Sequence, residues 1–456
     1  MGIEQRFVAS MAWVGGGWRR DVLLVAGEDG CWSDIVPDAA PALLSGAQTL
    51  GGPVLPGLVN GHSHAFQRAI AGLTERSAGG EDDFWRWRDR MYSVANRVTP
   101  DQLEAIAAHL YSELLQAGYT QVCEFHYLHN DLPGRPYSNA AEMSFALVRA
   151  ARRAGIGITL LPTLYMRSGF GARGLRNDQR RFASTPESVL RIVESVLRQG
   201  GGDGMVTAGV ALHSLRAVDE AALREVADAA GAAMPIHMHI AEQRLEVDDC
   251  IAMHGRRPIE WLLEKVAVDA RWNLVHATHT VPAELEGVRR GGASIVICPS
   301  TEANLGDGTF DLPEWMGQSG SWSIGSDSHV TRSWQEELRL LEYSQRLGLR
   351  QRNVAARAAL CESSATALFQ GALDGGSAAA GLPLGGLAVG QRADFVVVDA
   401  ASPALLGVPP DHLLDALMFS SPGAAIGETF VAGQAVAVPG FAEREAFVRA
   451  MNDLWA

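Results

Sequence analysis

Apolar residues are distributed differently in the middle of the chain and at its two ends. Between about residues 55 and 375, short runs that are almost entirely apolar alternate with segments whose apolar positions recur every three or four residues. Runs of the first kind are typical of strands buried on both faces, and segments of the second kind are typical of amphipathic helices. Eight apolar runs follow one another in this region: 54–60, 119–125, 156–165, 206–212, 234–241, 272–277, 293–299 and 321–327.

Helix signals fall between these runs. Thr99-Pro100-Asp101 and Thr185-Pro186-Glu187 each place a threonine at an N-cap and a proline at the first helical position, and Gly118 would end the first of these two helices. Residues 217–230 and 334–347 also have helical spacing. Strands that alternate with helices form parallel sheets, and eight such units predict an α/β fold with a (β/α)8 barrel of the TIM type. The two ends of the chain instead favour short strands and turns.

Composition and charge narrow the classes of function. The chain has 456 residues, of which 47% are apolar and 20% are charged, so it has ample material for a large core. The 52 acidic residues outnumber the 38 basic ones, and no basic block occurs. We therefore expect neither nucleic acid nor a membrane as a partner. No apolar run reaches the roughly 18 residues of a transmembrane helix.

The expected compartment is the cytoplasm. The first residues lack the basic segment and apolar segment of a secretion signal. The five cysteines are scattered, odd in number and without a CxxC motif, which is typical of reduced thiols.

Lys265 is the only lysine, so any chemistry that needs a lysine must use that position.

Histidines and one aspartate gather at the ends of the predicted barrel strands. His62 and His64 end the first strand, His239 lies in the fifth, His276 ends the sixth and Asp327 ends the eighth. Side chains two apart on a strand point to the same face, and the carboxyl ends of barrel strands share one face. Imidazoles with a carboxylate suit Zn²⁺ or Fe²⁺, and such a metal lowers the pKa of water towards neutrality. The pattern predicts a divalent metal centre.

The motifs PGLVNGHSH, HMHIAEQ, LVHATHT and GSDSH resemble those of the metal-dependent amidohydrolase superfamily, and the resemblance covers essentially the whole chain. It implies a barrel over residues 55–375 and a small β-sandwich built from residues 1–54 and 376–456. The carboxylated lysine of the superfamily lies on the fourth strand, whereas Lys265 follows the fifth-strand histidine. The lysine-bridged two-metal subgroup is therefore excluded. The mononuclear deaminase branch remains, with one divalent metal ion per chain and a homodimer as the expected assembly.

The resemblance also implies a role for each site residue. The metal ligands would be His62, His64, His239 and Asp327. Glu242 matches the proton shuttle that protonates the departing nitrogen, and Asp327 would take a proton from the attacking water. His276 matches the histidine that contacts the attacked group.

Three other histidines lie close to these positions in the sequence and are not predicted as ligands. His237 points to the same strand face as His239 but matches no ligand position, His279 is interpreted as structural, and His329 is interpreted as supporting the ligands. Glu124, after Cys123 in the second strand, is disfavoured as a bridging ligand.

Four further segments, GHSHAFQRAIAGLTE, DDFWRWRDRMY, FHYLHND and LHSLRAV, resemble the formimidoylglutamate deiminase family. That family hydrolyses N-formimino-L-glutamate to N-formyl-L-glutamate and ammonia in histidine degradation. Its substrate has two carboxylates, which arginine binds with two parallel hydrogen bonds. The family's substrate contacts match Gln67, Arg88, Tyr127, His213 and Arg216, with Arg88 interpreted as part of a loop after the first strand.

Two alternatives stay open from the sequence. A guanine- or cytosine-type nucleobase aminohydrolase would use the same metal chemistry, and the aromatic and basic segment DDFWRWRDRMY suits either substrate. An inactive barrel that acts as a scaffold is the alternative from another class, and the complete ligand set together with Glu242 argues against it.

Overall fold

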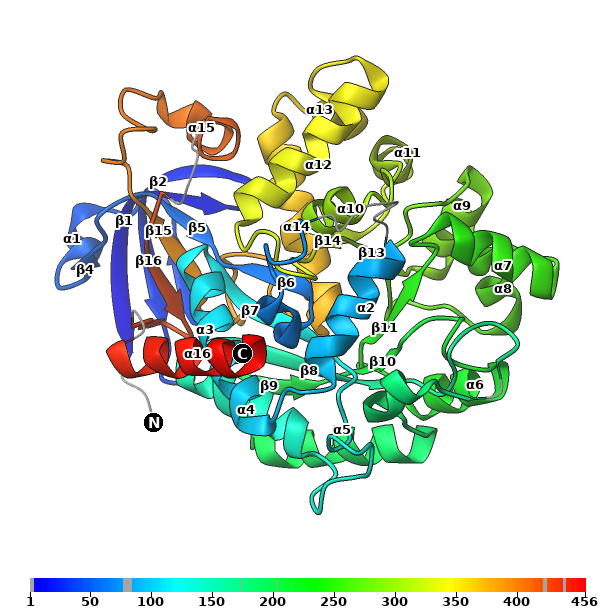
Figure 1. The fold of residues 1–456 in the computed structure, drawn as a ribbon. Coiled ribbons are helices and arrows are strands. Elements are labelled where there is room, and N and C mark those ends of the chain that lie inside the picture. Colours follow the sequence, from blue (N-terminus) through cyan, green and yellow to red (C-terminus); the bar gives the residue numbers. More distant parts are fainter. Residues whose placement is uncertain (1–3, 77–83, 173, 203, 421–424, 438–439) are drawn as a thin grey trace.

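The central element of the protein is a ring of eight parallel strands (Figure 1). The structure is a computed structural model that describes residues 4–76, 84–172, 174–202, 204–420, 425–437 and 440–456. The ring follows the chain order β6 (Leu58–Ser63), β7 (Tyr119–His126), β8 (Gly157–Leu164), β10 (Val210–Leu212), β11 (Ile236–Ile240), β12 (Trp272–His276), β13 (Ser294–Ile297) and β14 (Trp322–Ile324). The predicted (β/α)8 barrel is confirmed.

The barrel closes where two predicted metal-binding segments meet. Ser63, the last residue of β6, forms an isolated parallel bridge with Asp327, which lies beyond the end of β14. The Asp327 N–H donates to the carbonyl oxygen of His62 at 3.0 Å, and the His64 N–H donates to that of Asp327 at 3.2 Å. The seam between the first and last strands therefore also sets the distance between the predicted ligands that these two strands carry.

Helices cover the outside of the barrel. They include α3 (Pro100–Gln116), α4 (Glu142–Ala154), α5 (Pro186–Gly200), α6 (Glu220–Ala229), α7 (Arg244–His254), α8 (Pro258–Lys265), α9 (Pro282–Gly291), α12 (Trp334–Leu349) and α14 (Ser364–Ala380). Both predicted threonine caps are present, because Thr99 accepts from the Gln102 N–H at 3.3 Å and Thr185 from the Ser188 N–H at 3.2 Å. These caps satisfy amide groups that the first helical turn leaves without partners.

Glycines divide two of the predicted strands. The run 54–60 becomes β5 (Val54–Pro56) and β6, separated by Gly57, where a Cβ would lie 2.3 Å from the Thr120 side chain. The run 206–212 becomes β9 (Val206–Ala208) and β10, separated by Gly209, where a Cβ would lie 2.5 Å from the Pro235 carbonyl oxygen. The close approach of neighbouring chain at these glycines separates strands that read as continuous in the sequence.

Strands from both ends of the chain form a second sheet beside the barrel (Figure 1). Its order is β17 (Gln434–Ala435), β16 (Ile426–Val431), β15 (Phe395–Val398), β5, β1 (Gln5–Val14), β2 (Gly17–Ala26) and β3 (Trp32–Val36), with β4 (Gln48–Thr49) paired to β1. Phe7, Phe395 and Phe430 pack together in its core, with ring centroids 4.3–5.5 Å apart. β5 lies between β15 and β1, so it joins the two ends of the chain into one sheet.

The tail of the chain differs from its expected all-strand character, because it contains α15 (Leu413–Phe419) and α16 (Phe441–Trp455). α16 packs against α3, with Ala450 and Leu454 buried, and the Trp455 indole N–H donates to the Ala69 carbonyl oxygen at 2.9 Å. Few of its apolar positions are buried, so its pattern is weak without this contact. No helix in the described ranges combines the length and apolar character needed to cross a membrane.

Candidate active site

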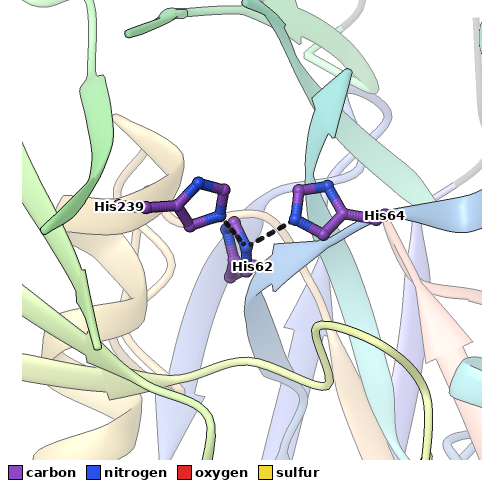
Figure 2. Close-up of side chains that lie close together, drawn as sticks. All are labelled: His62, His64 and His239. Atoms are coloured by element: carbon purple, nitrogen blue, oxygen red, sulfur yellow. Dashed lines mark hydrogen bonds between the residues drawn. The ribbon is translucent and has the colours of Figure 1, made fainter. Parts of the chain in front are cut away.

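Three histidine side chains converge at the carboxyl ends of the barrel strands (Figure 2). His62 and His64 come from β6 and its end, and His239 comes from β11. The Nε2 atom of His62 lies 3.1 Å from Nε2 of His64 and 3.0 Å from Nε2 of His239. All three side chains are buried. The spacing of two residues in the NGHSH motif therefore places both imidazoles on one face, as predicted.

The protonation of these imidazoles fits a bound cation. Nδ1 of His64 lies 2.8 Å from the Phe125 carbonyl oxygen, and Nδ1 of His239 lies 3.0 Å from that of His213. Because a carbonyl oxygen can only accept, both Nδ1 atoms carry the hydrogen and both Nε2 atoms present lone pairs. Burial lowers the pKa of His62 to about 3, so this ring is neutral as well. A divalent cation stabilises such facing lone pairs, and imidazole nitrogen is a preferred ligand of zinc.

Asp327, the fourth predicted ligand, faces two of these imidazoles across the barrel seam. Its Oδ1 lies 3.5 Å from Nε2 of His62 and 3.4 Å from Nε2 of His64. Burial would raise the pKa of the Asp327 carboxyl, but the surrounding imidazoles lower it below its usual value. The structure therefore brings together all four predicted ligands, as three neutral imidazoles and one carboxylate.

His276 lies between the two acids that were predicted to move protons. Its Nε2 is 3.8 Å from Oε1 of Glu242 and 3.8 Å from Oδ2 of Asp327, and its Nδ1 is 3.2 Å from Oε1 of Glu302. Burial alone would lower the pKa of His276, but Glu242, Glu302 and Asp327 raise it to about 10. Burial raises the pKa of Glu242, with opposing effects from His276 and Arg216. These contacts hold a proton on the imidazole, whereas the raised pKa of Glu242 comes from its burial and is opposed by His276.

The five predicted substrate contacts line one pocket above these residues. The pocket is bounded by His64, Gln67, Trp87, Arg88, Met91, Tyr92, Tyr127, Tyr165, His213, Arg216, His239, Glu242, His276, Leu305 and Asp327. Arg88 was interpreted as a loop residue, and that interpretation is wrong, because Arg88 lies on helix α2 (Phe84–Ala95). The buried Met91, Tyr92 and Ala95 recur on one side of this helix, a helical spacing that its many charged residues obscure in the sequence.

Arg216 joins the pocket to Glu242, the predicted proton shuttle. Its guanidinium lies 3.7 Å from Oε2 of Glu242 and 3.9 Å from Oε2 of Glu246, which is completely buried. Oε2 of Glu246 also accepts from the Glu242 N–H at 3.3 Å. One buried carboxylate therefore positions both Arg216 and the backbone of Glu242.

Comparison with known proteins agrees with this geometry. The model of the amidohydrolase family matches residues 54–436. The chain belongs to this family. It is 46% identical over 445 residues to the formimidoylglutamate deiminase of Pseudomonas aeruginosa, covering 96% of this chain and 97% of that protein.

Solved structures place the same fold in other members. An amidohydrolase from Brucella melitensis is 41% identical, with a TM-score of 0.93 over 99% of this chain and 100% of that one. An adenosine deaminase from Xanthomonas campestris, solved with bound zinc, is 20% identical, with a TM-score of 0.80 over 98% of both chains. The resemblance inferred from the motifs is thus confirmed.

Several residues that support the amidohydrolase site were not found from the sequence. Glu302 lies on α10 (Pro299–Leu305), beyond the end of β13, and contacts His276. Gln179, in the 3-10 segment η2 (Asn177–Phe182), donates to two tyrosines of the pocket wall. Glu302 follows the carboxyl end of the seventh barrel strand, and that position was a usable signal because this end faces the site. Gln179 lies in a long connection and offers no comparable signal.

The remaining candidate residues make contacts with the chain around the predicted metal site and are not among the converging side chains. His237 points its Nε2 to the Ala379 carbonyl oxygen at 2.8 Å, away from the converging rings. His329 lies between the Ser326 hydroxyl at 3.0 Å and the His64 carbonyl oxygen at 3.1 Å. Glu124 accepts from the Ser63 hydroxyl and the Ala65 N–H, both at 2.6 Å, and so fixes the chain around His64.

A matched pair of substitutions on β11 tests the metal centre. His239→Gln should abolish tight metal binding, because it removes one of four converging ligand atoms, whereas His237→Gln should leave metal binding intact. The measurement is the ratio of metal to protein by elemental analysis after dialysis. Retention of one ion per chain by His239→Gln, or loss of the ion from His237→Gln alone, would contradict the ligand assignment.

Proposed function

We propose that this amidohydrolase is a hydrolytic deiminase that converts N-formimino-L-glutamate and water to N-formyl-L-glutamate and ammonia. The observation that carries the proposal is the pairing of Arg88 and Arg216 in one pocket directly above the metal-binding residues. The chain has a net charge of −14, so two arginines at this position are a local departure from its acidic character. The 46% identical relative that bears the same activity in its name supports the assignment.

The proposed cofactor is one Zn²⁺ ion per chain, held by His62, His64, His239 and Asp327. Three imidazoles and one carboxylate are borderline to hard donors, which zinc accepts. Fe²⁺ takes the same donors, so the ligand set does not distinguish the two metals. Elemental analysis does distinguish them. A bound ion of this kind supplies Lewis acidity, which makes a water reactive near neutral pH.

The protein's own groups provide the proton transfers. Asp327 is ionised and can accept a proton at Oδ2, 3.8 Å from Nε2 of His276. Burial raises the pKa of Glu242, which favours the protonated carboxyl, and Glu242 is proposed to deliver that proton to the departing nitrogen. His276, held by Glu302 at Nδ1, keeps an N–H at Nε2 that can stabilise negative charge on the attacked group.

The pocket wall offers complementary groups for the rest of the substrate. The side-chain oxygen of Gln67 is buried and has no hydrogen-bond partner in the described part of the chain, so it can accept from a formimino N–H. Its amide nitrogen donates to the Tyr127 hydroxyl at 3.2 Å. Arg88 and Arg216 are proposed to bind the two carboxylates, and His213 to pack beside them. Such positioning orients the formimino carbon over the reactive groups.

The cellular setting is proposed with the activity. The reaction belongs to histidine degradation, and the five cysteines, all in described positions, are free thiols, as expected in the cytoplasm. The proposed assembly is a homodimer, and the proposed partner is a small diacid rather than a nucleic acid or membrane.

A side-by-side assay of ammonia release tests the function. The wild-type enzyme should act on N-formimino-L-glutamate with a higher kcat/KM than on guanine or cytosine, because the formimino compound has a linear amidine and two carboxylates for the two arginines. N-formimino-L-aspartate has the same groups on a chain one methylene shorter, so its kcat/KM reports how strictly the pocket reads the spacing of the carboxylates. A far higher kcat/KM on guanine or cytosine would replace this proposal with the nucleobase alternative. No turnover of any substrate by the metal-loaded protein would favour the inactive scaffold.

Substitution of the arginines tests how the substrate is held. Arg88→Met and Arg216→Met should each lower kcat/KM on N-formimino-L-glutamate roughly 30- to 5,000-fold, since losing one side of a buried charge pair costs about 2–5 kcal/mol. Arg→Lys should rescue only partly, because lysine has no planar fork. Arg97→Met, exposed just beyond α2, is the control for the loss of one charge. Unchanged kcat/KM in both pocket variants would refute the diacid subsite.

Substitution of the proton shuttle separates chemistry from metal binding. Glu242→Gln should retain the metal and lose about 10²- to 10⁴-fold in kcat, because the nearly isosteric amide cannot carry the proton. Elemental analysis and ammonia release are measured on the same preparation. A kcat close to that of the wild type would assign the role to another group, with Asp327 as the next candidate.

A further inference from the structure

Two tyrosines in the pocket wall share one hydrogen-bond donor. Tyr92 lies on α2 and Tyr165 directly follows β8, and their hydroxyl oxygens are 3.5 Å apart. The side-chain nitrogen of Gln179 donates to both hydroxyl oxygens, at 3.1 Å to Tyr92 and 3.0 Å to Tyr165. Both tyrosines line the pocket and are only 5–6% exposed.

The orientation of the Gln179 amide follows from its other contact. Its side-chain oxygen accepts from the Arg176 N–H at 3.0 Å. Because a backbone N–H can only donate, the amide oxygen must face Arg176, and the amide nitrogen must face the tyrosines. Gln179 is 1% exposed, so water does not compete for these hydrogen bonds and the amide keeps this orientation.

The tyrosines must therefore donate their own hydrogens elsewhere. Among the described residues, each hydroxyl has no acceptor apart from the other hydroxyl, and only one of the two can donate across that 3.5 Å contact. At least one O–H is thus left for the pocket. A buried hydroxyl hydrogen without an acceptor is costly, so a ligand in the pocket is expected to supply the acceptor.

The surrounding charges favour the same kind of ligand. The Arg88 guanidinium carbon lies 5.6 Å from the centre of the Tyr92 ring. Burial and the nearby Arg216 lower the pKa of Arg88, so the two guanidinium groups repel each other across this part of the pocket. An anion placed between these cations and the tyrosine hydroxyls would relieve the repulsion and accept the free hydrogen.

We propose that Tyr92 and Tyr165, oriented by Gln179, form a carboxylate-binding subsite that selects a diacid substrate. The inference rests on the proposed function and deepens it, because it names the donors that act beside the arginines. Gln179 is the positioning residue, since it donates to both hydroxyl oxygens and so leaves at least one hydroxyl hydrogen for the pocket.

The test combines three variants with three substrates. The variants are Tyr92→Phe with Tyr165→Phe as a double substitution, Gln179→Glu, and Tyr119→Phe. Tyr119 is a buried tyrosine of β7 whose hydroxyl has no partner within the described residues, so its substitution controls for loss of a hydroxyl alone. The substrates are N-formimino-L-glutamate, N-formimino-4-aminobutyrate, which lacks the α-carboxylate, and N-formimino-L-2-aminobutyrate, which lacks the side-chain carboxylate.

The double Phe variant should lose about 10- to 100-fold in kcat/KM on the diacid, as expected for hydrogen bonds to a charged group. The loss should shrink to about 3-fold or less on the analogue that lacks the bound carboxylate. Gln179→Glu keeps an oxygen for Arg176 but turns the tyrosine hydrogens towards itself, so it should show the same selective loss. Tyr119→Phe should match the wild type on all three substrates.

Two results would overturn the subsite. One is a double Phe variant that equals Tyr119→Phe on the diacid, and the other is an equal loss on all three substrates, which would indicate a general distortion. Metal content and the midpoint of thermal unfolding, measured on each variant, identify such a distortion directly. Failure of the proposed function is distinct, because the wild type itself would then release no ammonia from N-formimino-L-glutamate.

Discussion

The structure depends on holding three imidazole lone pairs and one carboxylate at a single buried point. Nε2 atoms only 3.0–3.1 Å apart repel each other unless a cation lies among them. Rigid backbone contacts oppose that repulsion, because the hydrogen bonds between Asp327 and the chain at His62 and His64 are also the bonds that close the barrel. Asn60 and Ser326 reinforce the seam through hydrogen bonds of 2.7 and 2.9 Å. The hydrogen bonds that close the barrel therefore also fix the positions of the predicted ligands.

The same convergence explains where the backbone is strained. Residues with positive φ follow three strand ends that face the site: Ala241 (52°), His276 (69°), Ala277 (49°), Asp327 (44°) and His329 (65°). Left-handed conformations of such residues cost about 1–3 kcal/mol each and persist only where the surroundings enforce them. Two contacts hold these conformations in place. The Glu302 carboxylate contacts the His276 ring, and the Ser326 hydroxyl contacts the His329 ring. These are five of the twelve non-glycine residues with positive φ among the described residues, and they lie where the chain leaves the strands beside the pocket.

The sequence predicted the parts of the molecule that follow local periodicity. The strand runs, the threonine caps and the pairing of His62 with His64 all depend on neighbours within a few residues. The α16 helix was missed because its apolar positions gain meaning only against α3, and α2 was missed because charged residues interrupt its buried side. The breaks at Gly57 and Gly209 also depend on distant chain, through Thr120 and Pro235. Contacts of this kind leave no periodic signal in either segment.

The supporting acids show why the site's electrostatics were harder to foresee than its ligands. Two of the cations that face the pocket each have a buried carboxylate from another element behind them: Glu302 on α10 behind His276, and Glu246 on α7 behind Arg216. Each acid is separated from its cation by 26 to 30 positions in the sequence, and neither belongs to a ligand motif. Buried charges are tolerated only in pairs, so these acids permit a buried imidazolium and a buried guanidinium to stay charged. Because Glu246 also accepts from the Glu242 N–H, one buried carboxylate supports both Arg216, the proposed substrate contact, and Glu242, the proposed proton shuttle.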